Sequence, residues 1–544
     1  MKVIVIGAGI SGILASIRLP RRIPNLDLVV YDKNPEVGGT WYENKYPGIA
    51  CDIPAHVYQA SFEPNPNWSQ FYASGNEILE YWKGIVAKYD VRKYMKLSHK
   101  IIEARFNEAE SKWHVKVENC LTGDVLEDSC DVLYACIGAL NDWKWPEIPG
   151  LQSFKGRLLH SAAWDESWDA TGLNVAVIGS GSSAIQIVPA LQPKAKHLDN
   201  YVRGQAWIAP PIAEAEVRKH TLTESNFHFT PEELSTFNEK PEVLLEYRKK
   251  LDSEIQSMTK VTLRGSFSEK AAADFTANMR AKLAKKPEIL DKILPSFMPG
   301  CRRITPGPGY LEALVEDNVS FVSEAICGVT EDGIMTIDGQ LRKVDAIICA
   351  TGFDTSFTKR FPIYGVGGMD LASKWQEYPD TYISLSTRGA PNLFIAHGPN
   401  SGLGVGSLSI VLERTCDYVC NVVAKMQKDR IATIQPKQEA CDLFVDYCKQ
   451  YFEKTVFTLP CRSWYKRGTT DGPVSALWPG SALHYVKTLE KPRFEDYDFT
   501  YVGGNKVAWL GDGFTVCERD DVVGKSKYLD PENVDYPSLT VASV

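Results

Sequence analysis

Two glycine-rich turns in the sequence have the spacing that binds the pyrophosphate of a dinucleotide. The first turn, GAGISG, contains Gly7, Gly9 and Gly12 and follows a short β-branched run at residues 3–6. Glycines at this spacing tighten the turn, let a phosphate approach the backbone, and let the next helix pack on the strand. Asp32 ends the second strand, where a carboxylate accepts ribose hydroxyls. The motif therefore predicts a nucleotide site near the N-terminus.

The second turn, GSGSSA, predicts another nucleotide site. Its residues are Gly179, Ser180, Gly181, Ser182, Ser183 and Ala184. No carboxylate follows the second strand of this unit, and Arg203 stands in its place. A guanidinium at that position suits the 2′-phosphate of NADPH, although an arginine on a loop is also commonly a solvated surface residue. We therefore expect NADPH in preference to NADH.

The elements around these turns form two βαβ units. Strands are expected at residues 3–6 and 28–31 with a helix to Leu19 between them, and at 175–178 and near Tyr201 with a helix over 184–191. Further strands are expected at 344–350 and 391–395. Residues 211–298 contain charged, helix-favouring stretches, which predict a helical insertion. The fold class is therefore α/β, with two Rossmann-like dinucleotide-binding domains and a helical insertion.

Composition excludes several classes of protein. With 544 residues and a net charge of −8, the chain lacks the basic patch that binds nucleic acid, and no apolar run is long enough to span a bilayer. The apolar N-terminus reads as a strand and turn, not as a signal peptide. The 13 cysteines show no close paired spacing, which predicts free thiols, no metal site and a cytoplasmic location. Cys416 and Cys420 are expected to be buried on one helix face.

The segment FKGRLLHSAAWD identifies the chain as similar to a known family. Phe154, Gly156, His160, Trp164 and Asp165 fit the pattern FxGxxxHxxxW followed by Pro or Asp. This pattern lies just before the second nucleotide unit, and it resembles the fingerprint of the type I Baeyer-Villiger monooxygenases. Taken alone, His160 would more often be a structural histidine; in the family it resembles a linker that couples domain movement to catalysis.

Other matches to this family cover nearly the whole chain. They include YPGIACD, GCRR, ATGFD, PNLF, GPNS and SWY. Asp32 replaces the more usual glutamate, Ala184 replaces a glycine, and CIG replaces an ATG-like tripeptide at residues 136–138. The helical insertion and residues 467–497 match least well. Substrate contacts are expected in these two segments.

The resemblance implies an FAD-dependent enzyme that uses NADPH and O2. A C4a-peroxyflavin would attack a ketone and give an ester or lactone, and the protein would keep that site dry and next to a fixed cation. Arg303 aligns with the family's active-site arginine, and Asp52 resembles its acidic partner. If the MPGCRRIT segment is extended, Arg302 points the opposite way, towards the NADP 2′-phosphate.

Further residues are implied to contact the cofactors. The loop GGTWYENKYPGIACD brings backbone and a flat apolar side chain near a ligand, although Trp41 could equally be a core residue. The implied contacts are Lys33, Gly39, Thr40, Trp41, Tyr58, Ile101 and Trp464.

The resemblance also implies a discontinuous domain order. The FAD-binding domain is expected at 1–148 and 346–544, the latter including a C-terminal segment that contacts substrate and NADP. The NADP-binding domain is expected at 149–210 and 299–345, around the insertion at 211–298.

Three other functions fit parts of the sequence. An N- or S-oxygenating flavin monooxygenase would share the nucleotide motifs, but its fingerprint normally ends differently from HxxxWD. A disulfide reductase would need a redox CxxxxC pair near the first unit, where none occurs. A non-catalytic nucleotide sensor would not need Arg303, Asp52 or the fingerprint.

Overall fold

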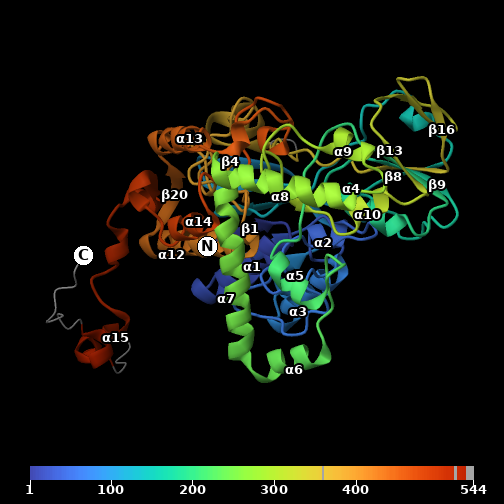
Figure 1. Cartoon of the computed structure of the whole chain (residues 1–544). Helices are drawn as coiled ribbons and strands as arrows, with labels where there is room; N and C mark the ends of the chain where they lie inside the picture. The colour runs from blue at the N-terminus through green and yellow to red at the C-terminus, as the bar shows by residue number, and fades with distance from the viewer. Residues whose placement is uncertain (358–359, 520–523, 535–544) are drawn as a thin grey trace.

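A five-stranded parallel sheet forms the centre of the larger lobe in Figure 1. The structure is a computed structural model that describes residues 1–357, 360–519 and 524–534. The strand order β19-β7-β1-β2-β3 places β1 between β7 and β2, so the first glycine turn leaves the middle of the sheet. The strands are β1 (Lys2–Ile6), β2 (Asp27–Tyr31), β3 (Met95–Lys96), β7 (Val132–Ala135) and β19 (Leu393–Ile395).

A second five-stranded parallel sheet forms the smaller lobe, with the order β13-β10-β9-β17-β8. Its strands are β8 (Arg157–His160), β9 (Asn174–Ile178), β10 (His197–Tyr201), β13 (Val319–Val322) and β17 (Ala346–Cys349). The expected domain boundary at residue 345 is therefore too early. All four residues of β17 are buried and pair with both β9 and β8, so the chain leaves this lobe only after Cys349.

Shorter sheets flank the two parallel ones. β4 (His99–Asn107), β5 (Lys112–Asn119) and β6 (Val125–Cys130) form an antiparallel sheet that β18 (Ile363–Tyr364) joins. β14 (Ile326–Val329), β15 (Gly333–Thr336) and β16 (Leu341–Lys343) form another in the smaller lobe. Two pairs complete the set: β11 (Ile208–Ala209) with β12 (Thr305–Pro306), and β20 (Ile431–Pro436) with β21 (Tyr497–Tyr501).

Helices cover the parallel sheets and bury their apolar faces. α1 (Ile10–Arg22) follows the first turn and packs against the long α12 (Leu408–Asp429). Arg18 of α1 donates to the buried carboxylates of Glu413 and Asp417, which fixes one helix on the other. Cys416 and Cys420 are buried in α12 as expected. The remaining helices of the two lobes are α2 (Thr40–Glu43), α3 (Gly75–Lys88), α4 (Ser182–Leu191), α10 (Tyr310–Leu314), α11 (Leu371–Lys374), α13 (Gln438–Phe452) and α14 (Ala482–Thr488), while α15 (Val516–Arg519) lies in the segment after β21.

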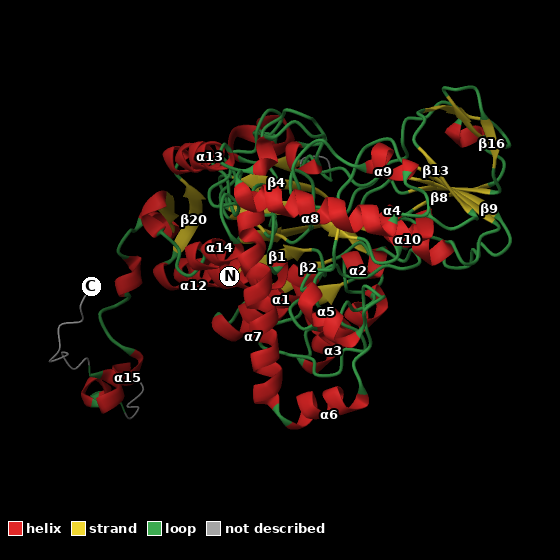
Figure 2. Cartoon of the chain, viewed as in Figure 1, coloured by secondary structure: helices red, strands yellow, loops and turns green. Residues whose placement is uncertain are grey.

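The insertion is helical, as the sequence predicts. It contains α5 (Glu214–His220), α6 (Pro231–Glu239), α7 (Pro241–Ser257), α8 (Ser266–Lys282) and α9 (Glu288–Ile293). In Figure 1 the long α8 runs from the larger lobe towards the smaller one, and α7 descends along the larger lobe. Figure 2 shows the chain after β21 leaving the main body at the left. None of the described helices combines the length and apolar character that a bilayer crossing requires.

Candidate functional site

The first glycine turn has no room for side chains at two of its positions. Gly7 has a φ of +103°, and a Cβ atom there would lie 2.5 Å from the carbonyl oxygen of Cys136. A Cβ at Gly12 would lie 1.9 Å from the Gly7 carbonyl oxygen. Gly9 is different, because its Cβ position faces the Gly39 Cα at 3.5 Å. The loop that carries Gly39 therefore lies directly against the turn. Gly9 and Gly39 leave the backbone of both segments uncovered by side chains at the same place.

Asp32 braces this cradle. Its carboxylate accepts hydrogen bonds from the backbone N–H groups of Ala8 at 2.6 Å and Asn34 at 2.7 Å. The side chain is buried, and burial raises the pKa of Asp32 above its ordinary value against the effect of these hydrogen bonds. Lys33 lies next to it and pairs with Glu43 at 3.1 Å, at the wall of an open polar cleft of about 460 Å³.

The second turn is tight at its first glycine and open at its second. Gly179 has a φ of +137°, and a Cβ there would lie 2.4 Å from the Ala350 carbonyl oxygen. No described heavy atom lies within 4 Å of the Cβ position of Gly181. Ala184 is fully buried on α4, so the methyl group that replaces the third glycine packs in the core. Ser182 and Ser183 begin α4, whose N-terminus carries a partial positive charge towards an anion.

Four cations gather beside the second turn. Arg302 donates to the carbonyl oxygen of Gln205 at 3.0 Å, and its guanidinium lies against Gly204, next to Arg203. Burial, followed by the charges of Arg462 and Arg203, lowers the pKa of Arg302 below its ordinary value. Burial lowers the pKa of Lys466 below its ordinary value. The charge of Asp471 acts to raise this pKa, and the charge of Arg302 acts to lower it.

This cluster has unfilled hydrogen-bonding capacity. The Nε atom of Arg302 is buried and has no hydrogen-bond partner among the described residues. Among the residues that the structure describes, no carboxylate forms an ion pair with Arg203, Arg302 or Arg462. Arg302 is partly buried, whereas Arg203 and Arg462 are exposed to solvent, so the buried Nε of Arg302 is the donor that lacks a partner. The arrangement suits a phosphate.

Arg303 contacts a different part of the protein from Arg302, and residues 301 and 302 form a bend and not the extended segment on which the expectation was based. Its Nε donates to Asp52 at 3.1 Å, and its Nη2 donates to the two oxygens of Asp52 at 2.7 and 2.8 Å. The charge of Asp52 is the largest influence and raises the pKa of Arg303. This forked contact fixes the plane of the guanidinium, which remains 32% exposed.

Arg303 lines a small cavity whose other walls are apolar. Ile212, Ile255 and Met258 come from the helical insertion and its approach, so the insertion contributes to the site. The remaining lining residues are Ile53, Ile304, Gly404, Val405 and Gly406. A permanently charged group that faces an apolar cavity can stabilise negative charge on a bound molecule.

Aromatic side chains extend this site. Trp41 is buried, and its ring contacts Tyr58 edge-on with 5.7 Å between centroids. Tyr465 is buried near Arg303, and burial raises the pKa of Tyr465 to about 12. Trp464 is half-buried and contacts the Tyr465 ring at 4.7 Å.

Two other expected cofactor contacts differ in exposure. Thr40 is exposed at the start of α2. The side chain of Ile101, on β4, is only 3% exposed and packs in the apolar core, so this side chain does not face a ligand site.

The fingerprint residues connect the two lobes. His160 ends β8, stacks on Trp143 with 4.4 Å between ring centroids, and lies 3.3 Å from the Thr351 hydroxyl. Its Nδ1 accepts from the Ala162 N–H at 3.1 Å, which assigns the proton of the neutral ring to Nε2. Burial lowers the pKa of His160 to about 4, so the ring is neutral at pH 7. His160 thus joins the linker to the segment after β17.

Local packing and hydrogen bonding explain the residue types at the other fingerprint positions. A Cβ at Gly156 would lie 2.4 Å from the Asp345 carbonyl oxygen, which explains the glycine. Phe154 is buried in the core of the smaller lobe, and Trp164 contacts Trp168 edge-on. Asp165 accepts from the Ser167 N–H at 2.9 Å and holds the turn after β8.

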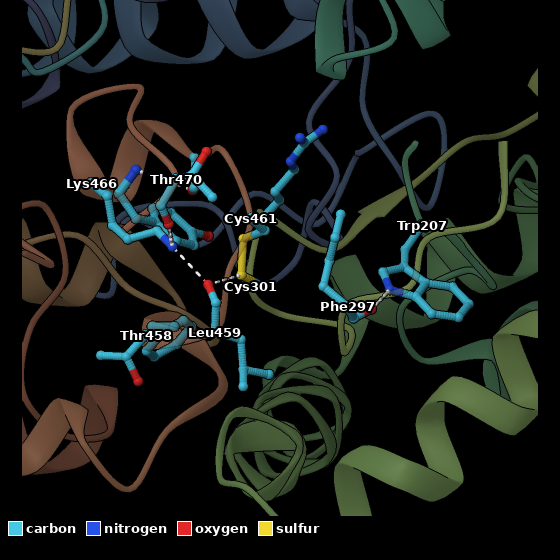
Figure 3. Close-up of a disulfide and its surroundings, with 12 residues drawn as sticks. Trp207, Phe297, Cys301, Thr458, Leu459, Cys461, Lys466 and Thr470 are labelled. Atoms are coloured by element: carbon cyan, nitrogen blue, oxygen red, sulfur yellow. Dashed lines mark hydrogen bonds between the residues drawn. A yellow bond between two sulfur atoms is a disulfide. The ribbon is translucent and has the colours of Figure 1, made fainter. Parts of the chain in front are cut away.

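A disulfide bond corrects the expectation that all cysteines are free. Cys301 and Cys461 are joined across 160 residues of sequence, and both are buried (Figure 3). The other eleven cysteines are free. No spacing pattern could reveal this pair, because the fold alone brings the two segments together.

Sequence reasoning also missed Arg462, Lys466 and Tyr465. The only signal was the SWY match with its adjacent basic residues. A further contact joins the lobes: Tyr46 donates to Gln186 of α4 at 2.9 Å, and a Cβ at Gly48 would lie 2.6 Å from the Gln186 carbonyl oxygen. The glycine of YPG therefore allows the first-lobe loop to touch α4.

Comparisons with known proteins agree with this geometry. The model of the NAD(P)-binding Rossmann-like domain matches residues 5–74. The FAD-binding monooxygenase tazF of Aspergillus terreus is 39% identical, with 96% of this chain and 93% of that protein covered. A Baeyer-Villiger monooxygenase of Pseudomonas aeruginosa is 33% identical over 88% of each chain.

Solved structures show the same architecture. The structure of cyclohexanone monooxygenase from Rhodococcus sp. Phi1 bound to NADP+ has a TM-score of 0.80 and 26% identity, covering 92% of this chain and 99% of that one. An oxidized steroid monooxygenase bound to NADP gives 0.78 and 27%, with the same coverage. The two nucleotide turns, the fingerprint and these full-length similarities show that the chain belongs to the FAD-binding monooxygenase family that includes the type I Baeyer-Villiger monooxygenases, whose cofactors are FAD and NADP.

Proposed function

We propose that this protein is an NADPH- and O2-dependent monooxygenase that inserts an oxygen atom beside the carbonyl of an apolar ketone. The observation that carries this proposal is Arg303, which Asp52 holds by a forked contact at the wall of an apolar cavity. The apolar side chains around Arg303 would keep water from a carbonyl bound beside them, and the guanidinium would supply fixed positive charge where negative charge develops on the carbonyl oxygen.

The two turns are assigned to different nucleotides. We assign FAD to the larger lobe, where Gly9 and Gly39 expose backbone and Asp32 lies at the end of β2. We assign NADP to the smaller lobe, where Gly181 leaves open space and the Arg203–Arg302 group is unpaired. When bound, FAD activates O2 using electrons from NADPH. Trp41 and Tyr58 provide apolar surface close to Asp52 in the chain.

The lobe assignments imply functional domains. The first lobe (1–148 and the chain after Cys349) would hold FAD, and the second (149–210 and 299–349) would hold NADP. Residues 211–298 would serve as the insertion that shapes the ketone pocket through Ile255 and Met258. His160 and Trp164 would transmit movement of the NADP lobe to the site, since His160 contacts Thr351 on the chain that returns to the larger lobe.

A competition experiment tests the activity. The purified flavoprotein is given NADPH, air and an equimolar mixture of a cyclic ketone, an aryl ketone, a thioether and a tertiary amine. The proposal predicts that esters or lactones form faster than the sulfoxide or N-oxide. Exclusive formation of sulfoxide or N-oxide would instead assign the protein to heteroatom oxygenation, and nucleotide binding without NADPH oxidation would indicate a sensor.

A further inference from the structure

The Cys301–Cys461 disulfide joins two peptides that both supply cations to the candidate phosphate site. Cys301 directly precedes Arg302 and Arg303, and Cys461 directly precedes Arg462. The exposed fractions of the two cysteines are 0% and 3%, so the bond lies inside the protein. It therefore fixes the separation of two chain segments that no strand pairing connects within the described residues.

The surroundings of the bond show how closely it is tied to the cation group. Lys466 donates to the carbonyl oxygen of Leu459 at 2.7 Å and to that of Thr470. The Sγ atom of Cys301 lies 3.2 Å from the same Leu459 oxygen (Figure 3). The disulfide and the buried ammonium group thus meet at one peptide group. A shift of residues 459–461 would move Lys466 and Arg462 together.

Electrostatic repulsion between these cations acts in the direction that would separate the two peptides. Arg203, Arg302, Arg462 and Lys466 are near enough that neighbouring cations lower the pKa values of Arg302 and Lys466. Like charges favour separation when no anion lies between them. A covalent bond between the peptides that carry Arg302 and Arg462 opposes that separation. Binding of an anion then requires less rearrangement of the protein.

We propose that the disulfide preassembles this cation group for the 2′-phosphate of NADPH, so that Cys301 and Cys461 are positioning residues for nucleotide selectivity. This inference rests on the proposed use of NADPH. A cross-link with only a structural role would stabilise the fold and would not distinguish nucleotides with a 2′-phosphate from those without it. Selectivity for the 2′-phosphate is therefore the property to measure.

The test compares binding of 2′,5′-ADP and 5′-AMP to the flavin-loaded protein by calorimetry. Cys301→Ser and Cys461→Ser should each weaken binding of 2′,5′-ADP by about tenfold and leave 5′-AMP nearly unchanged, because a preformed site has been loosened. The KM for NADPH should rise in parallel, with little change in the KM for NADH. Cys448→Ser is the matched control, because Cys448 is buried, free and on α13.

A second measurement uses the unmodified protein. Under anaerobic conditions dithiothreitol passes two electrons and two protons to the sulfurs, which gives two thiols and cyclic oxidised dithiothreitol. The reduced protein should show the same loss of selectivity as the serine variants. Before reduction, the denatured protein should contain eleven reactive thiols, the number of free cysteines.

The outcomes separate this inference from the proposed function. Equal weakening of both ligands, unchanged selectivity after loss of the bond, or thirteen reactive thiols before reduction would overturn the role of the disulfide alone. If the unmodified protein binds 2′,5′-ADP no more tightly than 5′-AMP, the assignment of NADPH fails and this inference fails with it.

Discussion

Among the described residues, Asp52 is the one carboxylate that holds Arg303. Asp52 contacts both Nε and Nη2 of the guanidinium, and the rest of the group faces the apolar cavity. Lysine would keep the charge at this place but could not use the forked contact. The charge and its direction can therefore be separated by substitution.

Arg303→Ala should retain FAD but lose most ketone oxygenation. Removing a preorganised charge from such a site typically costs about 3 to 4 kcal/mol, or roughly 100- to 1000-fold in rate. NADPH oxidation that continues should be diverted to hydrogen peroxide. Arg303→Lys should recover part of the product yield. NADPH consumption, ester and peroxide are measured together, and a ketone oxygenation rate equal to that of the parent would show that Arg303 does not act as the cation.

The sequence predicts some of these residues and not others. Arg303 and Asp52 were identified through GCRR and YPGIACD, and the structure confirms that they pair. Arg462 lies just before a short 3-10 helix and Lys466 ends it, and their importance depends on contacts with a segment about 160 residues earlier. Residue patterns describe local structure, whereas this group exists only in the fold.

At the scale of the elements, the two glycine turns differ in the space beside their second glycine. At Gly9 a side chain faces Gly39, whereas at Gly181 no described atom is near. Strand, turn and helix could be predicted for both units because short β-branched runs end in glycine. The space beside each glycine depends on what packs above it, and the sequence cannot show this.

Substitutions at these glycines should separate the two nucleotides. Gly9→Val should yield colourless protein, because the branched side chain would occupy space that the FAD pyrophosphate needs beside the backbone. Gly181→Val should fold with full flavin content but bind NADP+ at least ~10-fold more weakly, since its side chain enters space that a phosphate needs. Flavin absorbance and NADP+ titration measure both effects. The assignment is wrong if Gly9→Val retains flavin while Gly181→Val loses it.

The free energy of unfolding should depend on pH through His160, at the end of β8. Burial lowers its pKa to about 4 in the fold, whereas an unfolded histidine titrates near 6.5. The unfolded chain therefore binds more protons between pH 6.5 and 4, so stability falls as the pH falls through that range. This one residue would change the free energy of unfolding by about 3 kcal/mol.

His160→Gln should flatten the dependence of Tm on pH between 6.5 and 4, even if loss of the Trp143 contact lowers Tm at every pH. His228→Gln, on the surface, is the control. Fluorescence-monitored melting at closely spaced pH values measures the slope. Identical slopes in the parent and in His160→Gln would show that His160 does not have a lowered pKa in the folded protein.

At the scale of the whole molecule, the candidate sites lie where the lobes and the insertion meet. Arg303 follows the insertion and contacts Asp52 of the larger lobe, while Arg302 contacts the smaller lobe. The sequence predicts both sheets and the helical character of the insertion. The sequence predicts that the chain returns to the larger lobe after residue 345, whereas β17 still belongs to the sheet of the smaller lobe. The sequence does not separate β17 from the glycine-containing segment that follows it.

This position of Arg302 predicts a change in nucleotide preference. Replacing Arg203 and Arg302 together by alanine should raise the KM for NADPH at least ~10-fold, because two charge-assisted contacts to a phosphate are lost, and should affect NADH little. Steady-state kinetics with both nucleotides measure the ratio. Arg280→Ala, in the exposed basic stretch of α8, is a control that keeps this ratio unchanged. An unchanged ratio in the double variant would contradict an NADPH site at these residues.

The central claim is that the oxygen atom comes from O2 and enters beside a ketone carbonyl. The direct measurement is mass spectrometry of the product formed from a cyclic ketone by the purified flavoprotein with NADPH and ¹⁸O2. We predict a lactone with one ¹⁸O atom in the ring position and the original oxygen in the carbonyl. NADPH consumption that yields only hydrogen peroxide across the ketone panel, or a product without the label, would contradict the account.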